Sequence, residues 1–403
     1  MALRRDVLAS SAAALGVAAL PRTLFAALPT ERRLVVVLLR GGLDGLAAIA
    51  PYGDPAYAQA RGPLALPPPG APDGLLDLDG YFGLHPALAP LLPIYSAGEL
   101  LAVHACATPY RDRSHFSGQA VLESGMNEAG AAHDGWLGRA LRSRGGSPLA
   151  SVALAPTLPL ILRGEAGASS VPQAAEALGS TDLLDAVAPL YTRDPMLRSA
   201  FEAGRQTLAM TMGDHGADGT DGMGDTRDPM RIEGFATSAR NAGRLLARET
   251  GPRVAVLETF GWDTHAAQGA GDGKLARQLG ALAHGLVALK SGLGPAWRTT
   301  VVVALTEFGR TVAMNGSGGT DHGAGGLALL LGGAVQGGRV LADWPGLAPA
   351  DLHDGRELTP TVDVRSALKT VLHDHLGVEN AILDEIVFPD SRVAPPLGRL
   401  VAV

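Results

Sequence analysis

The chain of 403 residues contains one cysteine, Cys106. A lone thiol forms no disulfide within the chain, and it cannot build a zinc site from cysteines. Aromatic residues are also scarce, at 4% of the chain, so the core must be built mainly from Ala, Leu and Val. We therefore expect a fold that holds together by packing, without covalent cross-links.

Basic charge and long apolar runs are likewise limited. The chain has 33 Lys and Arg residues against 40 Asp and Glu residues, a net charge of −7. This balance argues against nucleic acid as a partner, because phosphate backbones attract basic surfaces. Beyond the N-terminal region, no segment has the roughly 20 apolar residues that a membrane span needs. The sequence therefore predicts no stable membrane span.

The N-terminal segment has the pattern of an export signal. Arg4 and Arg5 precede a mildly apolar stretch from Val7 to Leu20, and small residues follow near Ala26. The apolar stretch is shorter than a membrane anchor, and adjacent arginines ahead of it indicate the twin-arginine route. We predict that residues 1–26 form a signal peptide, that the twin-arginine export machinery is a partner, and that the mature protein is periplasmic or secreted.

The remainder, residues 30–403, is predicted to form one α/β domain. Buried-strand patterns alternate with helical ones, which favours a mostly parallel, doubly wound sheet flanked by helices. The expected strands are 34–39, 100–105, 253–257, 299–305 and 327–331, and the expected helices are 116–122, 136–141, 230–248, 274–290 and 364–376. A Gly- and Asp-rich segment at 212–228 is expected to be an inserted loop, since its acidic residues lack EF-hand spacing.

Three of the expected strands are followed by an acidic residue. These residues are Asp44, Asp263 and Glu307, each with glycines nearby. In an open parallel sheet, ligands bind at the carboxyl ends of the strands, so we expect these carboxylates to converge. Carboxylates that converge repel one another and need a counter-charge, for which a divalent metal is the usual solution.

Imidazoles are available beside these carboxylates. His265 lies two residues after Asp263, and the pair Asp321-His322 lies in a Gly-rich loop. A mixture of Asp, Glu and His ligands suits zinc, manganese or iron, whereas oxygen ligands alone suit magnesium or calcium. The sequence therefore predicts a divalent metal site formed by Asp44, Asp263, His265, Glu307, Asp321 and His322.

Each of these residues also has a purely structural interpretation. Asp44 could stabilise a Gly-rich turn, and Asp263 could cap a helix. Glu307 could pair with Arg310, and His322 could bond to backbone. The repeated placement of carboxylates after strands is what favours the metal site.

The chain resembles a family of uncharacterised, twin-arginine-exported bacterial proteins within the alkaline phosphatase and sulfatase-like superfamily. The matching stretches are LLRGGLDGL (38–46), RSHFSGQAVLESG (113–125), GWDTHAAQ (261–268), LTEFGRTVAMNGSGGTDHG (305–323) and LTPTVDVRSAL (358–368). The resemblance implies an alkaline phosphatase-like core that holds one or two ions of zinc, manganese or magnesium.

Within that superfamily, Asp44 looks like the first metal ligand, and Asp263, His265 and His322 look like the second set. Glu307 stands where many members have an Asp-His pair after a late strand. Here Phe308 follows in place of the histidine, so one imidazole of a two-metal site is missing.

Ser114 is the expected nucleophile, with His115 beside it in the catalytic set. A hydroxyl near a metal is activated, and a helix N-terminus favours an anion. The alternative is that Ser114 caps the following helix. Arg310 and Arg113 are candidate clamps for an oxyanion, since a guanidinium forks onto tetrahedral oxyanions. Cys106 fits the modified cysteine of sulfatases poorly, because its spacing is off by one residue.

We predict an exported metal-dependent hydrolase that acts on a phosphate or sulfate ester, either a small anionic ester or an envelope-derived substrate. The alternative is a non-catalytic metal-binding protein that binds or scaffolds an envelope glycan or other envelope component, which the missing imidazole favours. A third hypothesis is metal-dependent action on an envelope carbohydrate or lipid substituent.

Overall fold

The computed structural model describes residues 31–144, 150–165, 167–171 and 232–402. The expected signal peptide at 1–26, with Arg4 and Arg5, and the Gly/Asp-rich loop at 212–228 lie outside the described residues. Within the described ranges, no helix has both the length and the apolar character needed to cross a bilayer.

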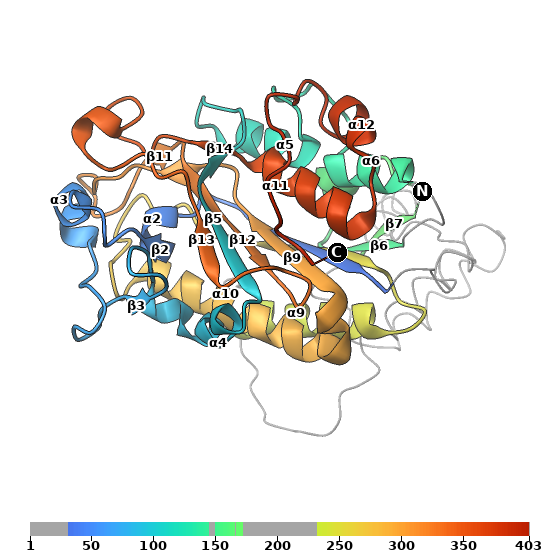
Figure 1. Ribbon diagram of the computed structural model, residues 1–403, viewed down its shortest axis with the longest axis horizontal. Helices are drawn as coiled ribbons and strands as arrows, with labels where there is room; N and C mark the ends of the chain where they lie inside the picture. The colour runs from blue at the N-terminus through green and yellow to red at the C-terminus, as the bar shows by residue number, and fades with distance from the viewer. Residues whose placement is uncertain (1–30, 145–149, 166, 172–231, 403) are drawn as a thin grey trace, which may run out of the picture.

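A nine-stranded sheet forms the centre of the described chain. Its order is β13 (Arg339–Leu341), β5 (Leu100–Ala107), β12 (Gly326–Leu331), β9 (Thr300–Leu305), β1 (Arg33–Leu39), β8 (Val254–Thr259), β6 (Ser151–Leu154) and β7 (Ala168–Ser170), and β14 (Val362–Asp363) also pairs with β5. Every pairing is parallel except those of β12, which is antiparallel to both β5 and β9. The predicted α/β class, with a mostly parallel sheet flanked by helices, is confirmed (Figure 1).

Both faces of this sheet are covered, which explains why its strands are apolar throughout. On β1, Val35 and Val37 join the core shared with α9 (Ile232–Ala247) and α10 (Lys274–Leu293), whereas Val36 belongs to the core on the opposite face. The opposite face is covered by α5 (His115–Ser124), α6 (Trp136–Ser143), α11 (Val364–Thr370) and α12 (Asn380–Ile382), as Figure 1 shows. Each fully buried strand side chain stabilises the fold by about 1.5–3 kcal/mol.

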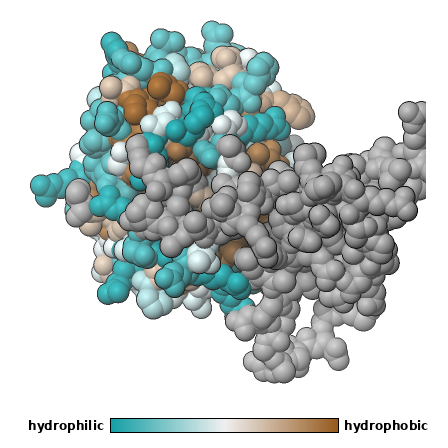
Figure 2. Space-filling model, turned by 90° about the vertical axis from the view of Figure 1, so that its right-hand side faces the viewer, coloured by the Kyte–Doolittle hydropathy of each residue, from teal (hydrophilic) through white to brown (hydrophobic). Residues whose placement is uncertain are grey.

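Short elements complete the described chain. A small sheet of β2 (Ile49–Ala50), β4 (Gly83–Leu84) and β3 (Leu76–Asp77) lies near α2 (Gly45–Ala48), α3 (Tyr57–Arg61) and α4 (Leu92–Ser96), and β10 (Gly309–Arg310) pairs with β11 (His322–Gly323). Short 3-10 segments lie at Gly62–Leu64, Pro86–Leu91, Leu160–Leu162, Gly294–Thr299 and Pro349–Asp351, and π-helical turns at Val371–His375 and Leu383–Val387. Figure 2 shows a largely hydrophilic described surface on one side of the molecule, with smaller hydrophobic areas among it.

The expected helices and strands match the structure closely. All five expected strands are present within two residues at each end, whereas β6, β7, β13 and β14 are too short or too mixed to stand out in the sequence. The expected start of α9 at Met230 lies outside the described residues. Within the expected mostly parallel sheet, β12 is antiparallel to its neighbours. No helix lies between β9 and β12, and parallel neighbours need such a crossover.

The loops that carry the candidate site residues lie together at one edge of the sheet, the edge formed by the carboxyl ends of its parallel strands. The carboxyl ends of β1, β5, β8 and β9 lie there because these strands run in one direction. β12 runs the other way, so it begins at this same edge. The loop that precedes β12, with Asp321 and His322, therefore meets the loops that follow the other four strands.

Candidate metal centre

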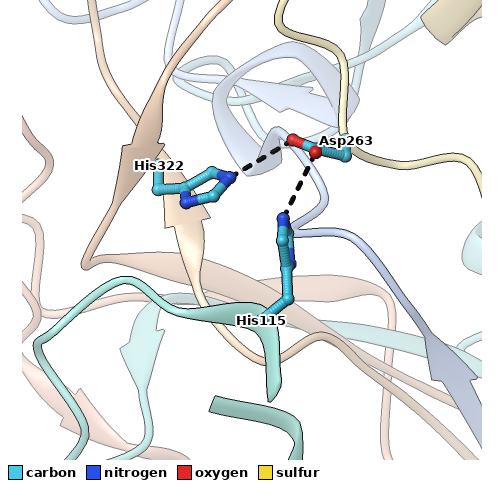
Figure 3. A group of neighbouring side chains, drawn as sticks. All are labelled: His115, Asp263 and His322. Carbon is cyan, nitrogen blue, oxygen red and sulfur yellow. Dashed lines mark hydrogen bonds and ion pairs between the residues drawn. The ribbon is translucent and has the colours of Figure 1, made fainter. Parts of the chain in front are cut away.

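Three side chains from distant parts of the chain converge at this edge. His115 is the first residue of α5 after β5, Asp263 lies in the loop after β8, and His322 lies on β11 before β12. One ligand atom from each lies within 4.8 Å of the others (Figure 3). The Asp263 side chain is 39% exposed, so the cluster is open to molecules from solvent.

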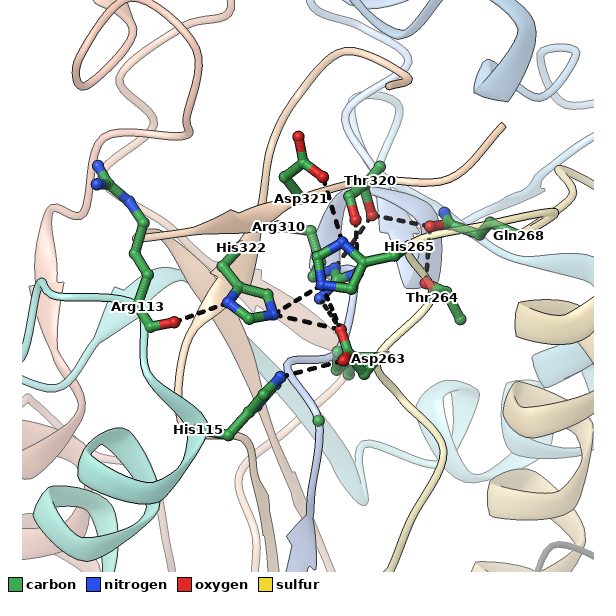
Figure 4. Close-up of polar contacts among 12 residues, drawn as sticks. Arg113, His115, Asp263, Thr264, His265, Gln268, Arg310, Thr320, Asp321 and His322 are labelled. Atoms are coloured by element: carbon green, nitrogen blue, oxygen red, sulfur yellow. Dashed lines mark hydrogen bonds and ion pairs between the residues drawn. The ribbon is translucent and has the colours of Figure 1, made fainter. Parts of the chain in front are cut away.

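The spacing of the ligand atoms fits a metal ion. Asp263 Oδ2 lies 3.3 Å from His115 Nε2, and Asp263 Oδ1 lies 3.3 Å from His322 Nε2. His265 Nε2 adds a further nitrogen, 3.0 Å from Asp263 Oδ1 and 3.0 Å from His322 Nε2 (Figure 4). Ligand atoms about 2.0–2.1 Å from a tetrahedral zinc ion lie roughly 3.3 Å from one another. The distances in the protein are close to this value.

All three histidines present the same ring nitrogen to the cluster. Each Nδ1 faces an oxygen that can only accept: Glu307 Oε1 at 2.8 Å from His115, Asp321 Oδ1 at 3.2 Å from His265, and the Arg113 carbonyl at 2.7 Å from His322. A neutral imidazole carries a single N–H, and here it is needed at Nδ1. Nε2 of each ring is then left with a lone pair, as in a metal-binding histidine.

The centre of this arrangement brings nitrogen lone pairs and a carboxylate together, and the guanidinium of Arg310 balances the carboxylate on one side, at Asp263 Oδ1. Nε2 of His265 and Nε2 of His322 lie 3.0 Å apart, and without hydrogens their lone pairs repel. Within the described part of the chain, buried His115 Nε2 has no partner in hydrogen-bond geometry, although Asp263 Oδ2 lies 3.3 Å away. A carboxylate and three nitrogen lone pairs that face one point are stabilised by a shared cation. The residues present therefore fit a divalent metal, and a proton would be the weaker substitute.

Arg310 holds the carboxylate of the cluster. Its fully buried guanidinium donates from Nη1 to Asp263 Oδ1 at 2.7 Å and from Nε to Thr320 Oγ1 at 3.1 Å. Burial tends to raise the pKa of Asp263, but the hydrogen bond and charge of Arg310 outweigh it and lower that pKa. Asp263 thus stays ionised. Arg310 was expected in the catalytic set as an oxyanion clamp, whereas in the structure it binds Asp263 and Thr320.

Glu307 lies behind His115 and outside the group of converging atoms. Its side chain is 1% exposed, and Oε1 accepts hydrogen bonds from the Gly41 backbone N–H at 2.9 Å, Gln119 Nε2 at 3.1 Å and His115 Nδ1. Burial tends to raise the pKa of Glu307, but these donors, His115 first, lower it overall. The hydrogen bond that His115 donates to Glu307 in turn raises the pKa of His115. Burial lowers the pKa of His322.

Asp44, expected as the first ligand, is engaged elsewhere. It is the N-cap of α2, where Oδ1 accepts from the Ala47 N–H at 3.1 Å. Its Oδ2 accepts from Arg61 Nη2 and from Gln268 Nε2, both at 2.7 Å, and the side chains of Asp44 and Arg61 are buried. Gln268 Oε1 accepts from Thr320 Oγ1 at 2.8 Å, so Asp44 connects to Arg310 through a buried polar chain. Asp321, another expected ligand, binds His265 Nδ1 from outside the cluster.

Ser114 lies at the N-cap of α5, directly before His115. It is exposed, and its side chain makes no capping hydrogen bond, so the hydroxyl is not used by the helix. The preceding Arg113 has a left-handed backbone with φ of 61°, which directs its carbonyl to His322. Its guanidinium binds Asp354 at 2.6 Å and Glu357 at 2.7 Å, which anchors that backbone from the other side.

The buried ring of Phe308 forms the floor of the cluster. Its centroid lies 4.9 Å from that of His115 and 4.8 Å from that of His322. The loop after β1 packs against this floor, because a Cβ on Gly42 would meet Phe308 at 2.8 Å. A Cβ on Gly41, whose φ is +125°, would lie 2.7 Å from the Asp263 backbone nitrogen. Phe308 follows Glu307 in the chain, and the imidazole of His115, from α5, packs against its ring.

Two residues of the site have no place among the sequence-based candidates. Gln119 contacts Glu307, and Asn315 contacts Asp321 at 2.9 Å. The spacing of four residues between His115 and Gln119, which places both on one helix face, is the signal that could have indicated Gln119.

Comparisons with known proteins give distant structural similarities. No curated protein matches the chain. Solved structures that resemble it include Ps i-CgsB in complex with k-i-k-neocarrahexaose, with a TM-score of 0.41 and 11% identity over 91% of this chain and 78% of that one. A phosphonate monoester hydrolase of Agrobacterium radiobacter has a TM-score of 0.33 and 11% identity over 86% of this chain and 74% of that one. A mutant TAB5 alkaline phosphatase with bound magnesium has a TM-score of 0.31 and 9% identity over 75% of this chain and 91% of that one.

A family model, in contrast, matches most of the chain. It covers residues 100–387, which include the strands β5, β8, β9 and β12 and all three residues of the cluster in Figure 3. The chain belongs to the family described as "Protein of unknown function (DUF1501)".

Proposed function

We propose that the protein is an exported metal-dependent hydrolase that acts on a phosphate or sulfate ester. The observation that carries this proposal is the convergence of three Nε2 lone pairs, from His115, His265 and His322, on the ionised carboxylate of Asp263. Nitrogen-rich ligand sets of this kind suit zinc, with manganese as the next choice, better than magnesium. The described residues support one such ion.

The bound metal would supply a Lewis acid that polarises an ester oxygen and lowers the pKa of a hydroxyl or water beside it. Ser114 is the proposed nucleophile, because its exposed hydroxyl lies next to His115 and is free of the helix. The first N–H groups of α5, a helix of ten residues, point toward the same end and favour an anionic substrate there. Glu307 holds His115, and Arg310 keeps Asp263 charged.

Metal content is the first test. Mature protein purified without added metal should contain about one divalent ion per chain by elemental analysis, and Asp263→Ala and His322→Ala should remove it. His284→Ala is the matched control, because His284 is exposed on α10 and bonds only to the Gly280 carbonyl in its own helix. A metal-free wild type, or metal retained in both cluster variants, would overturn the metal centre.

Turnover is the second test. Metal-loaded protein should hydrolyse at least one of an aryl phosphate, a phosphodiester or an aryl sulfate, and Ser114→Ala should lower kcat without changing the metal content. Metal-loaded protein that turns over none of them would support a non-catalytic protein that binds an envelope glycan or other envelope component. Full activity in Ser114→Ala would remove Ser114 as nucleophile and leave water in that role.

Export is tested separately. A reporter fused to the N-terminal segment should be exported by the twin-arginine machinery and retained inside after Arg4→Lys and Arg5→Lys together. Loading of the metal before export gives a physical reason for this route, since it carries folded proteins. Equal export of the double variant would refute the twin-arginine assignment and leave the metal centre untouched.

A further inference from the structure

We propose that the side-chain amides of Gln119 and Asn315 are positioning residues that fix which ring nitrogen carries the hydrogen in His115 and His265. The proposal rests on the metal centre proposed above, because it concerns how that centre keeps its Nε2 lone pairs available. Neither amide bonds to Nε2 of a histidine or to Asp263. Each acts one hydrogen bond further out, on the carboxylate that receives the Nδ1 hydrogen.

The orientation of Gln119 follows from its neighbour Arg40. A guanidinium can only donate, and Arg40 Nη1 lies 3.0 Å from Gln119 Oε1. The oxygen of the amide is therefore committed to Arg40, and its NH2 group faces Glu307 Oε1 at 3.1 Å. Arg40 is itself held by ion pairs with Glu123, at 2.9 Å, and Glu258.

Through Glu307, Gln119 determines which nitrogen of His115 carries the hydrogen. Glu307 Oε1 receives hydrogens from Gln119 and from the Gly41 backbone, so it is occupied as an acceptor. At 2.8 Å from this oxygen, Nδ1 of His115 must donate as well. The single hydrogen of the neutral ring is thereby fixed at Nδ1, and the lone pair of Nε2 faces Asp263.

Asn315 acts in the same way on His265, through Asp321. Its Oδ1 accepts from the backbone N–H groups of Ser317 at 2.9 Å and Gly319 at 3.1 Å, which can only donate. Its Nδ2 must then donate, to Asp321 Oδ1 at 2.9 Å and to the His265 carbonyl at 3.0 Å. Asp321 is occupied as an acceptor, and Nδ1 of His265 donates to it at 3.2 Å.

A carboxylate in place of either amide would reverse one hydrogen bond. It would present an acceptor where a donor is required, and the two carboxylates would then hold a proton between them. A protonated Glu307 or Asp321 can donate to Nδ1, which moves the imidazole hydrogen to Nε2 and points it at the metal position. Loss of such an outer partner of a metal-binding histidine lowers metal affinity by about 10- to 100-fold.

The substitutions Gln119→Glu and Asn315→Asp test this directly, because they keep the shape of the side chain. At position 315 the carboxylate still accepts from Ser317 and Gly319, so the turn is preserved. Gln119→Met is a second variant that removes the donor without adding charge, for use if the carboxylate prevents folding. Matched controls are Gln59→Glu on α3 and Asn380→Asp at the start of α12, both exposed.

Two readouts on the full mature chain separate the possibilities. Nitrogen-15 NMR of the metal-free protein, at the lowest pH at which both rings are neutral, should show His115 and His265 with hydrogen at Nδ1. Gln119→Glu should shift the hydrogen of His115 but not of His265, and Asn315→Asp should do the reverse. Zinc titration should show affinity about 10- to 100-fold weaker in each variant and unchanged in the controls.

The outcomes also separate this proposal from the proposed function. Unchanged ring hydrogens with unchanged zinc affinity in both variants would overturn the positioning role. If wild type binds no zinc but the ring hydrogens shift as expected, the amides set the hydrogen position and the metal centre is wrong. If zinc affinity falls without any shift of the ring hydrogens, the amides act only on structure, and the proposal fails.

Discussion

Replacement of the Glu307 carboxylate is the sharpest probe of the proposed metal centre. In Glu307→Gln the side chain keeps its shape, but His115 loses the anionic partner of its Nδ1–H at 2.8 Å. An imidazole whose other nitrogen bonds to a carboxylate is a more basic ligand, and loss of that partner lowers metal affinity by about 10- to 100-fold. This corresponds to about 1.4–2.7 kcal/mol of binding free energy.

The size of this loss should depend on pH. Glu307 raises the pKa of His115, so in wild type a proton competes with zinc for Nε2 already at mildly acid pH. Below that pKa, wild-type affinity should fall by about tenfold per pH unit. In Glu307→Gln the pKa of His115 drops, and its affinity should stay level to lower pH. The two affinities should therefore differ most at high pH and converge as the pH falls.

Calorimetric titration of metal-free protein with zinc, from pH 6 to pH 9, measures both curves. Glu99→Gln is the control: Glu99 bonds to Lys290 and Trp297 at the start of β5, at the opposite edge of the sheet. A constant ratio of affinities at all pH values would refute the role of Glu307 in the basicity of His115. Equal affinities throughout would refute its contact with a metal ligand.

Three further predictions concern the scaffold. Gly41→Ala should lower stability by about 1–3 kcal/mol in urea denaturation and weaken zinc binding. Gly70→Ala, also at a positive φ but with no atom within 4 Å of its Cβ position, should leave zinc binding unchanged. Burial lowers the pKa of His375 to about 4. Its contribution to the free energy of unfolding is therefore complete above the unfolded pKa of about 6.5 and is lost as the pH falls toward 4. In this pH range, His375→Gln should make the free energy of unfolding less dependent on pH, by about 1.4 kcal/mol per pH unit. Burial raises the pKa of Cys106 to about 12, so a thiol reagent at pH 8 should label it only after denaturation.

The sequence located the strands and the edge where the site lies, because both follow from local patterns. Buried strands read as apolar runs, and their carboxyl ends are the places where polar loop residues meet. The sequence indicated His322 as a candidate ligand but did not show what brings it to that edge. It arrives there because β12 is antiparallel, which depends on how β9 and β12 connect and not on the pattern of β12 itself.

Contacts one step away from the cluster depend on geometry that no sequence pattern expresses. Asp44, Asp263 and Glu307 look equivalent in the sequence, since each follows a strand. The structure distinguishes them. Asp263 faces all three histidines, and Glu307 contacts His115 but neither of the other two. Asp44 pairs with Arg61. Differences of a few ångströms in side-chain reach decide these roles. The role of Gln119 likewise requires the direction of each hydrogen bond in a chain that begins at Arg40.

The origin of the three cluster residues in separate segments of the chain has a consequence for the stability of the fold. Asp263 and His322 are 59 residues apart, and His115 begins α5, which follows β5, a strand separated from β8 by β12, β9 and β1. A metal ion held between them would tie these segments together, as a disulfide does in a cross-linked protein. At a free concentration of about 100 times Kd, it would add about 2.7 kcal/mol to the free energy of unfolding. In a chain with a single thiol, a chelator would then act as a reductant acts on a disulfide-bonded protein.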